Sequence, residues 1–159
     1  MPSATIRSAM TAGALAAALT VSLSSQAAAD VGDEDIVRLK LVGVTKTDSR
    51  PYYTLAGDSW STYMHLYTPG NKHVGDAGSR CTAIEAPLLE DRVTTQCTRV
   101  LRLKDGEITL HDVITREGAK RVTAKTAIAG GTGKYNDAEG EGYITLEGDR
   151  VTFDLYVDD

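Results

Sequence analysis

A glycine-rich stretch, residues 128–142, carries the residue types of a phosphate-binding loop. A P-loop needs the spacing Gly-x-x-x-x-Gly-Lys-Ser/Thr, because its backbone N–H groups cradle phosphates and its hydroxyl binds Mg²⁺. Gly133 and Lys134 fit, but Ile128 occupies the first glycine position and Tyr135 the hydroxyl position. No helix-length amphipathic run follows to supply an N-terminal dipole. The spacing therefore favours a tight corner between two strands, built from residues that tolerate positive φ.

The two cysteines, Cys81 and Cys97, could form a disulfide or leave a reactive thiol. A turn-like stretch, residues 86–91, separates them, and a turn centred near Leu89 would place them opposite each other on paired strands. In an exported protein this predicts a disulfide, worth about 3 kcal/mol by chain entropy. The alternative is a free Cys81 thiol in a pocket. The three histidines are scattered and form no metal-type spacing with the cysteines, so we expect no metal or other cofactor.

Two charged residues, Arg99 and Asp112, fall on an otherwise apolar face. They belong to a hairpin over residues 92–114, whose Asp-Gly pair is typical of a tight turn. Pairing across that turn places Leu103 near Ile108 and Arg99 opposite Asp112. Because a lone buried charge is costly, the two charges are expected to pair. The pair is either a structural ion pair near a barrel end or a polar anchor in a ligand cavity. Both interpretations depend on the predicted register, because a shift of one residue would move side chains to the other face of the sheet.

The N-terminus has the features of a targeting segment. Arg7 is the only charge before a weakly apolar stretch, residues 9–23, which is too short and interrupted to span a membrane. Ala27-Ala28-Ala29 then fits the small-x-small cleavage rule. We therefore expect residues 1–29 to be a cleaved signal peptide, residues 30–159 to form one domain, and the protein to be secreted. The net charge of −5 argues against a nucleic-acid partner.

Seven short segments alternate apolar and polar residues, and tight turns join them. They are residues 36–46, 60–67, 92–103, 107–114, 121–129, 139–146 and 150–157. A short polar run, residues 73–80, leads into the cysteine hairpin, which makes seven or eight strands in all. No segment has a convincing helical pattern, and successive hairpins need no long crossover. The pattern predicts an all-β fold, an eight-stranded antiparallel up-and-down β-barrel of calycin-like type. A barrel of this size holds either a packed core or one small ligand.

Several motifs resemble the allene oxide cyclase and dirigent protein superfamily. Gly57-Asp58 followed by Leu66-Tyr67-Thr68 and the segment 74–81 looks like the early strands and loop of the cyclases. The glycine corner is similar to that of both branches and is the most specific part, and residues 151–157 look like their last strand. The resemblance covers most of residues 37–157. The chain is thus identified as a secreted, bacterial-type member with an allene oxide cyclase barrel-like domain.

The resemblance implies a barrel with an apolar cavity, a small apolar ligand and, commonly, assembly as a homotrimer. Its members close a ring in an unstable epoxide or steer the coupling of reactive intermediates, and both chemistries depend on positioning. The cyclases use a carboxylate and an asparagine shortly before a proline. Pro51 matches that proline, but residues 42–45 offer neither side chain, and the family's pocket cysteine corresponds to Cys81, which we expect to be oxidised. These departures argue against allene oxide cyclisation itself.

We therefore expect a cyclase or isomerase that directs cyclisation, isomerisation or stereoselective coupling of a small apolar molecule. Arg99 and Asp112 are the candidate catalytic residues. The candidate ligand-binding residues are those near the mouth or beside the charged pair, namely Asp58, Tyr63, Tyr67, Leu101 and Leu110. Asp58 is equally suited to form a turn after Gly57. The alternatives are a lipocalin-type carrier without chemistry and a secreted barrel whose outer surface engages a protein.

Overall fold

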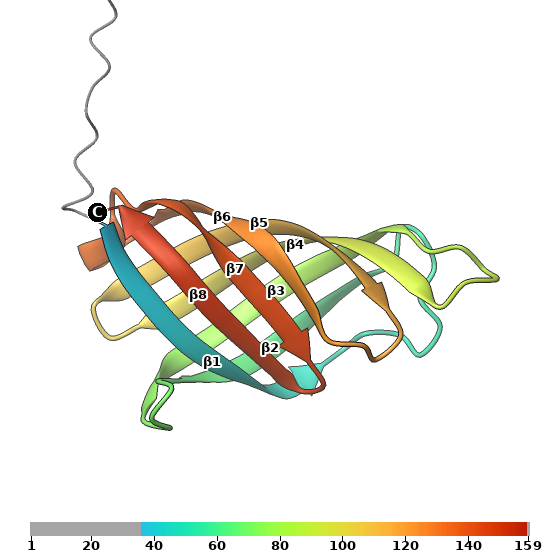
Figure 1. Cartoon of the computed structure of the whole chain (residues 1–159), viewed down its shortest axis with the longest axis horizontal. Coiled ribbons are helices and arrows are strands. Elements are labelled where there is room, and N and C mark those ends of the chain that lie inside the picture. The colour runs from blue at the N-terminus through green and yellow to red at the C-terminus, as the bar shows by residue number, and fades with distance from the viewer. Residues whose placement is uncertain (1–35, 159) are drawn as a thin grey trace, which may run out of the picture. The chain divides into compact units, whose positions relative to one another are not determined.

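The computed structural model describes residues 36–158, which form eight strands and one short 3-10 helix (Figure 1). The elements are β1 (Ile36–Asp48), β2 (Ser59–Tyr67), β3 (His73–Glu85), β4 (Arg92–Leu103), β5 (Gly106–Glu117), β6 (Val122–Gly131), η1 (Gly133–Tyr135), β7 (Glu139–Glu147) and β8 (Arg150–Asp158). The expected signal peptide, residues 1–29, lies outside the described residues.

The strands form a closed antiparallel barrel in which each strand pairs with the next along the chain. The barrel closes where β1 runs beside β8, with Ile36 opposite Asp158 and Val44 opposite Arg150 (Figure 1). Closure of the ladder satisfies the backbone groups that an edge strand would leave unpaired. The predicted all-β, eight-stranded up-and-down barrel is confirmed.

The register of the β4–β5 hairpin differs from the predicted one by two residues. Leu103 pairs with Gly106, so the two-residue turn is Lys104–Asp105 and Arg99 lies opposite Leu110. A shift of two residues keeps every side chain on its predicted face, because successive side chains of a strand alternate between faces. Arg99 and Asp112 are therefore diagonal rather than direct neighbours, a separation that a long side chain can span.

Side chains fill most of the barrel interior. The largest fully buried ones are Met64, Leu66, Leu101, Ile108, Leu110, Ile114, Ile144, Phe153, Leu155 and Val157. A second, smaller cluster contains Trp60, Cys81, Ala83 and Cys97. The interior is therefore a packed core over most of its length, and an enclosed cavity remains where the second cluster meets polar side chains.

The glycine-rich stretch is a corner between β6 and β7, as predicted. The backbone N–H of Lys134 donates to the Asp105 carbonyl (2.8 Å), which ties the corner to the β4–β5 turn. Gly133 has a φ of +63°, which favours glycine, and a Cβ on Gly131 would collide with the backbone oxygens of Tyr135 and Glu107. The corner needs its glycines for conformation and close packing rather than for phosphate binding.

The barrel has two rims with different contents. The glycine rim carries the corner and the β4–β5 turn, at the end where β1 begins and β8 ends. The opposite rim carries the β1–β2 loop (residues 49–58), the β3–β4 loop (residues 86–91) and the β7–β8 turn. We call it the arginine rim, after Arg50 in the β1–β2 loop and Arg150 at the start of β8. The two rims lie at opposite ends of the strands (Figure 1).

Candidate functional site

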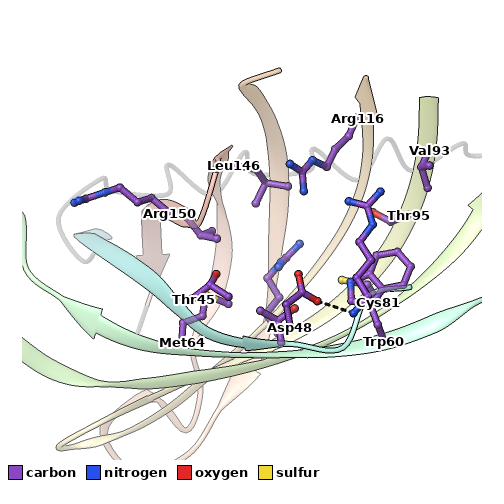
Figure 2. A pocket seen from close by; sticks show the side chains of 15 residues that line it. Thr45, Asp48, Trp60, Met64, Cys81, Val93, Thr95, Arg116, Leu146 and Arg150 are labelled. Atoms are coloured by element: carbon purple, nitrogen blue, oxygen red, sulfur yellow. Dashed lines mark hydrogen bonds between the residues drawn. The ribbon is translucent and has the colours of Figure 1, made fainter. Parts of the chain in front are cut away.

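A cavity of about 70 Å³ lies inside the barrel at the arginine rim. Its lining includes four arginines and one carboxylate, namely Arg50, Arg99, Arg116, Arg150 and Asp48. Figure 2 shows Arg150 on one side of the cavity and Trp60, Cys81 and Thr95 on the other. One buried water occupies roughly 10–15 Å³ by the same kind of measure, so the cavity has room for a group of a few heavy atoms.

Arg99 and Asp112 form an ion pair that reaches from β4 to β5. The Arg99 Nε donates to Asp112 Oδ2 (2.7 Å) and Nη2 donates to Oδ1 (3.1 Å), so the pairing is bidentate. The side chains are 5% and 0% exposed. This geometry fixes the plane of the guanidinium group. Arg99 lines the cavity, and Asp112 lies behind it as its partner.

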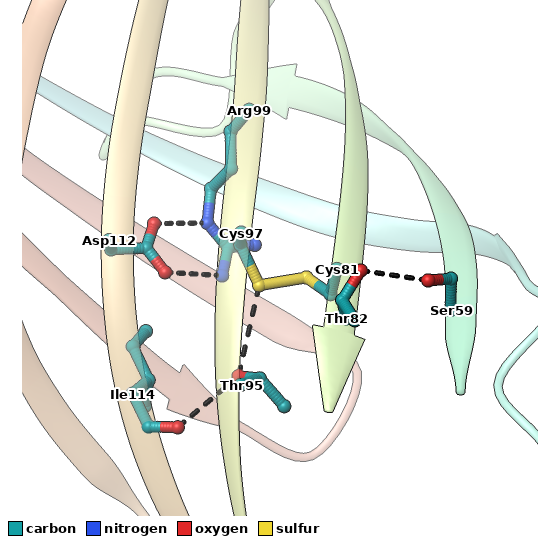
Figure 3. The surroundings of a disulfide bond; sticks show 8 residues. All are labelled: Ser59, Cys81, Thr82, Thr95, Cys97, Arg99, Asp112 and Ile114. Atoms are coloured by element: carbon teal, nitrogen blue, oxygen red, sulfur yellow. Dashed lines mark hydrogen bonds and ion pairs between the residues drawn. A yellow bond between two sulfur atoms is a disulfide. The ribbon is translucent and has the colours of Figure 1, made fainter. Parts of the chain in front are cut away.

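A disulfide braces the wall beside this ion pair. Cys81 on β3 and Cys97 on β4 are directly opposite each other and are bonded, as predicted, with their Cα atoms 4.1 Å apart. Cys97 is in turn opposite Asp112 on β5 (Figure 3). The Thr95 hydroxyl donates to the Ile114 carbonyl (3.2 Å) on the same wall. At the level of the Arg99 side chain, the disulfide thus links β3 to β4, and the ion pair and the Thr95 hydrogen bond link β4 to β5.

Arg50 enters the cavity from the β1–β2 loop. Its backbone N–H donates to the Asp48 carboxylate (2.9 Å) and its Nε donates to the Thr54 hydroxyl (3.3 Å). The guanidinium carbon lies 5.4 Å from the centroid of the Trp60 ring, within the range of a cation–π interaction. The loop, rather than a strand, therefore delivers this charge to the cavity.

Arg116 is the least well compensated charge of the site. It faces inward from β5, two residues beyond the buried Ile114. Its Nε is buried and has no hydrogen-bond partner among the described residues. Burial, and next the positive charge of Arg50, lower the pKa of Arg116, although an arginine stays protonated at neutral pH. Neither Arg50 nor Arg116 forms an ion pair within residues 36–158.

The structure brings only part of the sequence-predicted site together. Arg99, Asp112 and the disulfide meet at the cavity wall. Leu101 and Leu110 are fully buried in the packed core and do not line the cavity. The lining is also more polar and more positive than an apolar ligand alone would need.

The remaining predicted residues lie elsewhere. Tyr63 and Tyr67 alternate with the buried Met64 and point to the outer face, where their rings contact histidine rings edge-on. Asp58 closes the β1–β2 loop, because its carboxylate accepts a hydrogen bond from the Leu55 backbone N–H (2.8 Å). These three residues do not line the cavity.

Three residues of the cavity, Arg50, Trp60 and Arg116, were not predicted from the sequence as site residues. Arg116 had a usable signal, since it continues the inward alternation through Asp112 and Ile114 by one more step. Arg50 had none, because it lies in a loop whose path depends on tertiary contacts. Within the described part of the chain, no group of three or more His, Cys, Asp or Glu side chains is placed to hold a metal ion. No helix between residues 36 and 158 is long and apolar enough to cross a membrane.

Comparisons with known proteins give matches in structure but not in sequence. No protein-family model matches the chain, and no curated protein sequence matches it. Among solved structures, a pyocyanin demethylase is similar with 26% identity and a TM-score of 0.58, over 75% of this chain and 99% of that one. The pterocarpan synthase dirigent protein GePTS1 is similar with 16% identity and a TM-score of 0.58, over 86% and 97%.

A third solved structure is AbnU, an exo-specific intermolecular Diels-Alderase. It is similar with 16% identity and a TM-score of 0.50, over 76% of this chain and 95% of that one. All three comparisons cover most of both chains, so the shared part is the whole barrel and not one hairpin. The chain therefore shares its closed eight-stranded barrel fold with these proteins, among them a dirigent protein and a Diels-Alderase.

Proposed function

We propose that the barrel takes part of a small molecule into the cavity at the arginine rim and directs its cyclisation, isomerisation or stereoselective coupling. The observation that carries the proposal is the oriented guanidinium group of Arg99 in a buried polar cavity. The names of the similar structures support the reaction class, since they include a dirigent protein and a Diels-Alderase. We further propose that the protein acts after secretion.

The arrangement suits reactions that depend on positioning and on charge stabilisation. A guanidinium held in one plane can donate to a carbonyl oxygen and stabilise negative charge that develops on it, without reorganising during the reaction. Asp112 positions Arg99 rather than contacting the substrate, because it lies behind the guanidinium group. The disulfide keeps β3 and β4 at a fixed separation beside Arg99. Such preorganisation restricts a bound molecule to reactive geometries.

A comparison of the small molecules made by the source organism tests this proposal and does not require an identified substrate. The parent strain is compared with a deletion strain, and with deletion strains that express the wild-type or the Arg99→Met protein. We expect deletion to replace one cyclised product or stereoisomer by its uncyclised precursor or by an isomer mixture. The wild-type protein should restore the product, whereas Arg99→Met should not. Identical profiles of the parent and deletion strains would overturn the proposal.

The packed interior favours a second candidate, a barrel that engages a protein through its outer surface. Leu88 and Leu89 on the β3–β4 loop are 85% and 100% exposed, which is unusual for leucine. This candidate predicts that deletion leaves the small-molecule profile unchanged. A carrier without chemistry predicts that the amount of a compound changes while its chemical form does not.

A further inference from the structure

The cavity at the arginine rim has an excess of positive charge. The charge of Arg99 is balanced by Asp112, but Arg50, Arg116 and Arg150 in the lining have only Asp48 to oppose them. Asp48 accepts a backbone hydrogen bond from Arg50 and forms no ion pair within the described residues. The buried Nε of Arg116 has no hydrogen-bond partner in residues 36–158. A negatively charged group would satisfy both the charge and the donor.

The size of the cavity limits what can enter it. Pockets that enclose drug-sized ligands measure about 300–1,000 Å³, whereas this cavity measures about 70 Å³. A carboxylate, or an enolate or phenolate oxygen with its neighbouring atoms, is of suitable size. Guanidinium groups match such oxygens because their N–H donors form a planar fork. The rest of the ligand must lie outside the cavity.

A groove next to the cavity can hold the rest of the ligand. It has a volume of about 350 Å³, runs between the β1–β2 and β3–β4 loops, and shares Arg50 and Val93 with the cavity. Its apolar lining includes Tyr52, Tyr53 and Leu88, which are 92%, 80% and 85% exposed. The groove also contains Glu90 and Asp91, and Glu90 pairs with Arg92. These carboxylates disfavour a second negative charge on the ligand body.

We propose that the substrate is an amphiphilic monoanion, whose charged head binds Arg50 and Arg116 in the cavity and whose apolar or aromatic body lies in the groove between the two loops. This inference rests on the proposed function, since it names the class of molecule that the same site takes. It replaces the expected apolar ligand by one with a single negative charge at one end.

Binding of a matched pair of probes tests the assignment. The anion 3-phenylpropionate and its neutral analogue 3-phenylpropanamide have the same size and differ in charge. We expect the anion to bind with a millimolar dissociation constant, as suits so small a ligand, and about tenfold more tightly than the amide. Isothermal titration calorimetry at neutral pH measures both, and ¹H–¹⁵N NMR shifts locate the bound probe.

Three variants place the effect on the arginines. Arg116→Gln and Arg50→Gln should each weaken binding of the anion about tenfold and leave binding of the amide unchanged. The matched control is Arg80→Gln, since Arg80 is exposed on the outer face of β3. It should change binding of the anion less than about twofold. Circular dichroism confirms that each variant is folded, and a misfolded Arg116→Gln still leaves Arg50→Gln and the two-probe comparison.

Several results would overturn the inference. Equal affinity of wild-type protein for the two probes would show that charge is not recognised, and so would an equal loss of binding in Arg80→Gln. No binding of 3-phenylpropionate at about 10 mM would show that no such site exists. NMR shifts confined to residues away from the two loops would place the anion elsewhere. None of these results depends on the small-molecule profile of the deletion strain, so each inference can fail without the other.

Discussion

The buried pair Arg99–Asp112 gives the sharpest test of how the site is built. Asp112→Asn keeps the shape of the side chain and removes its charge, which leaves the guanidinium of Arg99, 5% exposed, close to Arg116 and Arg50. Removing one partner of a buried pair costs about 3–5 kcal/mol, because the other charge stays uncompensated. A domain of this size is stable by roughly 5–15 kcal/mol, so the loss is a large share of the total.

A double-mutant cycle separates the free energy of interaction between Arg99 and Asp112 from the effect of losing each side chain alone. Arg99→Met alone should cost a similar amount, since it leaves the Asp112 carboxylate buried without a partner. The cycle is closed by the single variant Asp112→Leu, which should lose about as much as Asp112→Asn, and by the double variant Arg99→Met/Asp112→Leu. The double variant should lie within about 1 kcal/mol of wild type or be more stable, because both charges are gone. The coupling free energy, which is the sum of the two single losses minus the loss of the double variant, should therefore reach at least about 5 kcal/mol. The exposed pair Lys125–Glu141, with side chains 62% and 58% exposed, is the control and should couple by less than about 1 kcal/mol.

Urea denaturation at low ionic strength measures these free energies, because urea does not screen charges as a guanidinium salt does. Trp60 is the only tryptophan and is 8% exposed, so its fluorescence reports unfolding, with circular dichroism as a second probe. If each single variant lost less than about 1 kcal/mol, the pair would behave as a solvated one. If the double variant lost the sum of both single losses, the charges would not be coupled. Either result would refute the buried, mutually compensating pair.

Three further predictions concern the disulfide, the glycine corner and a surface ion pair. Replacing both cysteines by serine should lower the stability by about 3 kcal/mol and the melting temperature by about 10 °C, measured by calorimetry; an unchanged melting temperature would contradict the bracing role. Gly131→Ala should cost more than about 2 kcal/mol because its Cβ meets backbone oxygens, whereas Gly78→Ala, with open space around it, should cost less than about 1 kcal/mol; equal losses in urea denaturation would refute this contrast. The hydrogen bond from Arg38 lowers the pKa of Asp154 below 3.8, so Arg38→Gln should reduce stability at neutral pH slightly, as for other exposed ion pairs. That stability belongs to the ionised carboxylate, so the difference between wild type and variant should shrink as the pH falls below 3.8 and Asp154 becomes protonated. A difference that stays constant as the pH is lowered below 3.8 would contradict it.

The fold could be predicted from the sequence because the strands alternate clearly and the turns are short. Residues 139–146 and 150–157, predicted as successive strands joined by a tight turn, form the β7–β8 hairpin, in which Ile144 pairs with Phe153 and Leu146 with Val151. The predicted β4–β5 register was wrong by two residues, because the local sequence is compatible with two different turns. Gly106 enters the ladder where the Thr132 carbonyl packs against it, a contact that no local pattern reveals.

The site could be predicted only where it follows the strand alternation. Arg99 and Asp112 could be predicted because they are charged residues on an apolar face. The error in the predicted register was two residues, so both side chains stayed on that face. Arg116 follows the same alternation but lies beyond the predicted end of its strand. Arg50 lies in a loop, and the cavity itself depends on how Trp60 packs, so neither has a periodic signal.

The separation of the two rims has a consequence for how such a barrel can diversify. The closed ladder and the glycine rim hold the fold together at positions that the arginine rim does not use. Loops tolerate substitution and insertion better than the strands they connect. Lineages can therefore exchange residues in the β1–β2 and β3–β4 loops, and acquire new ligands, while the ladder is inherited unchanged.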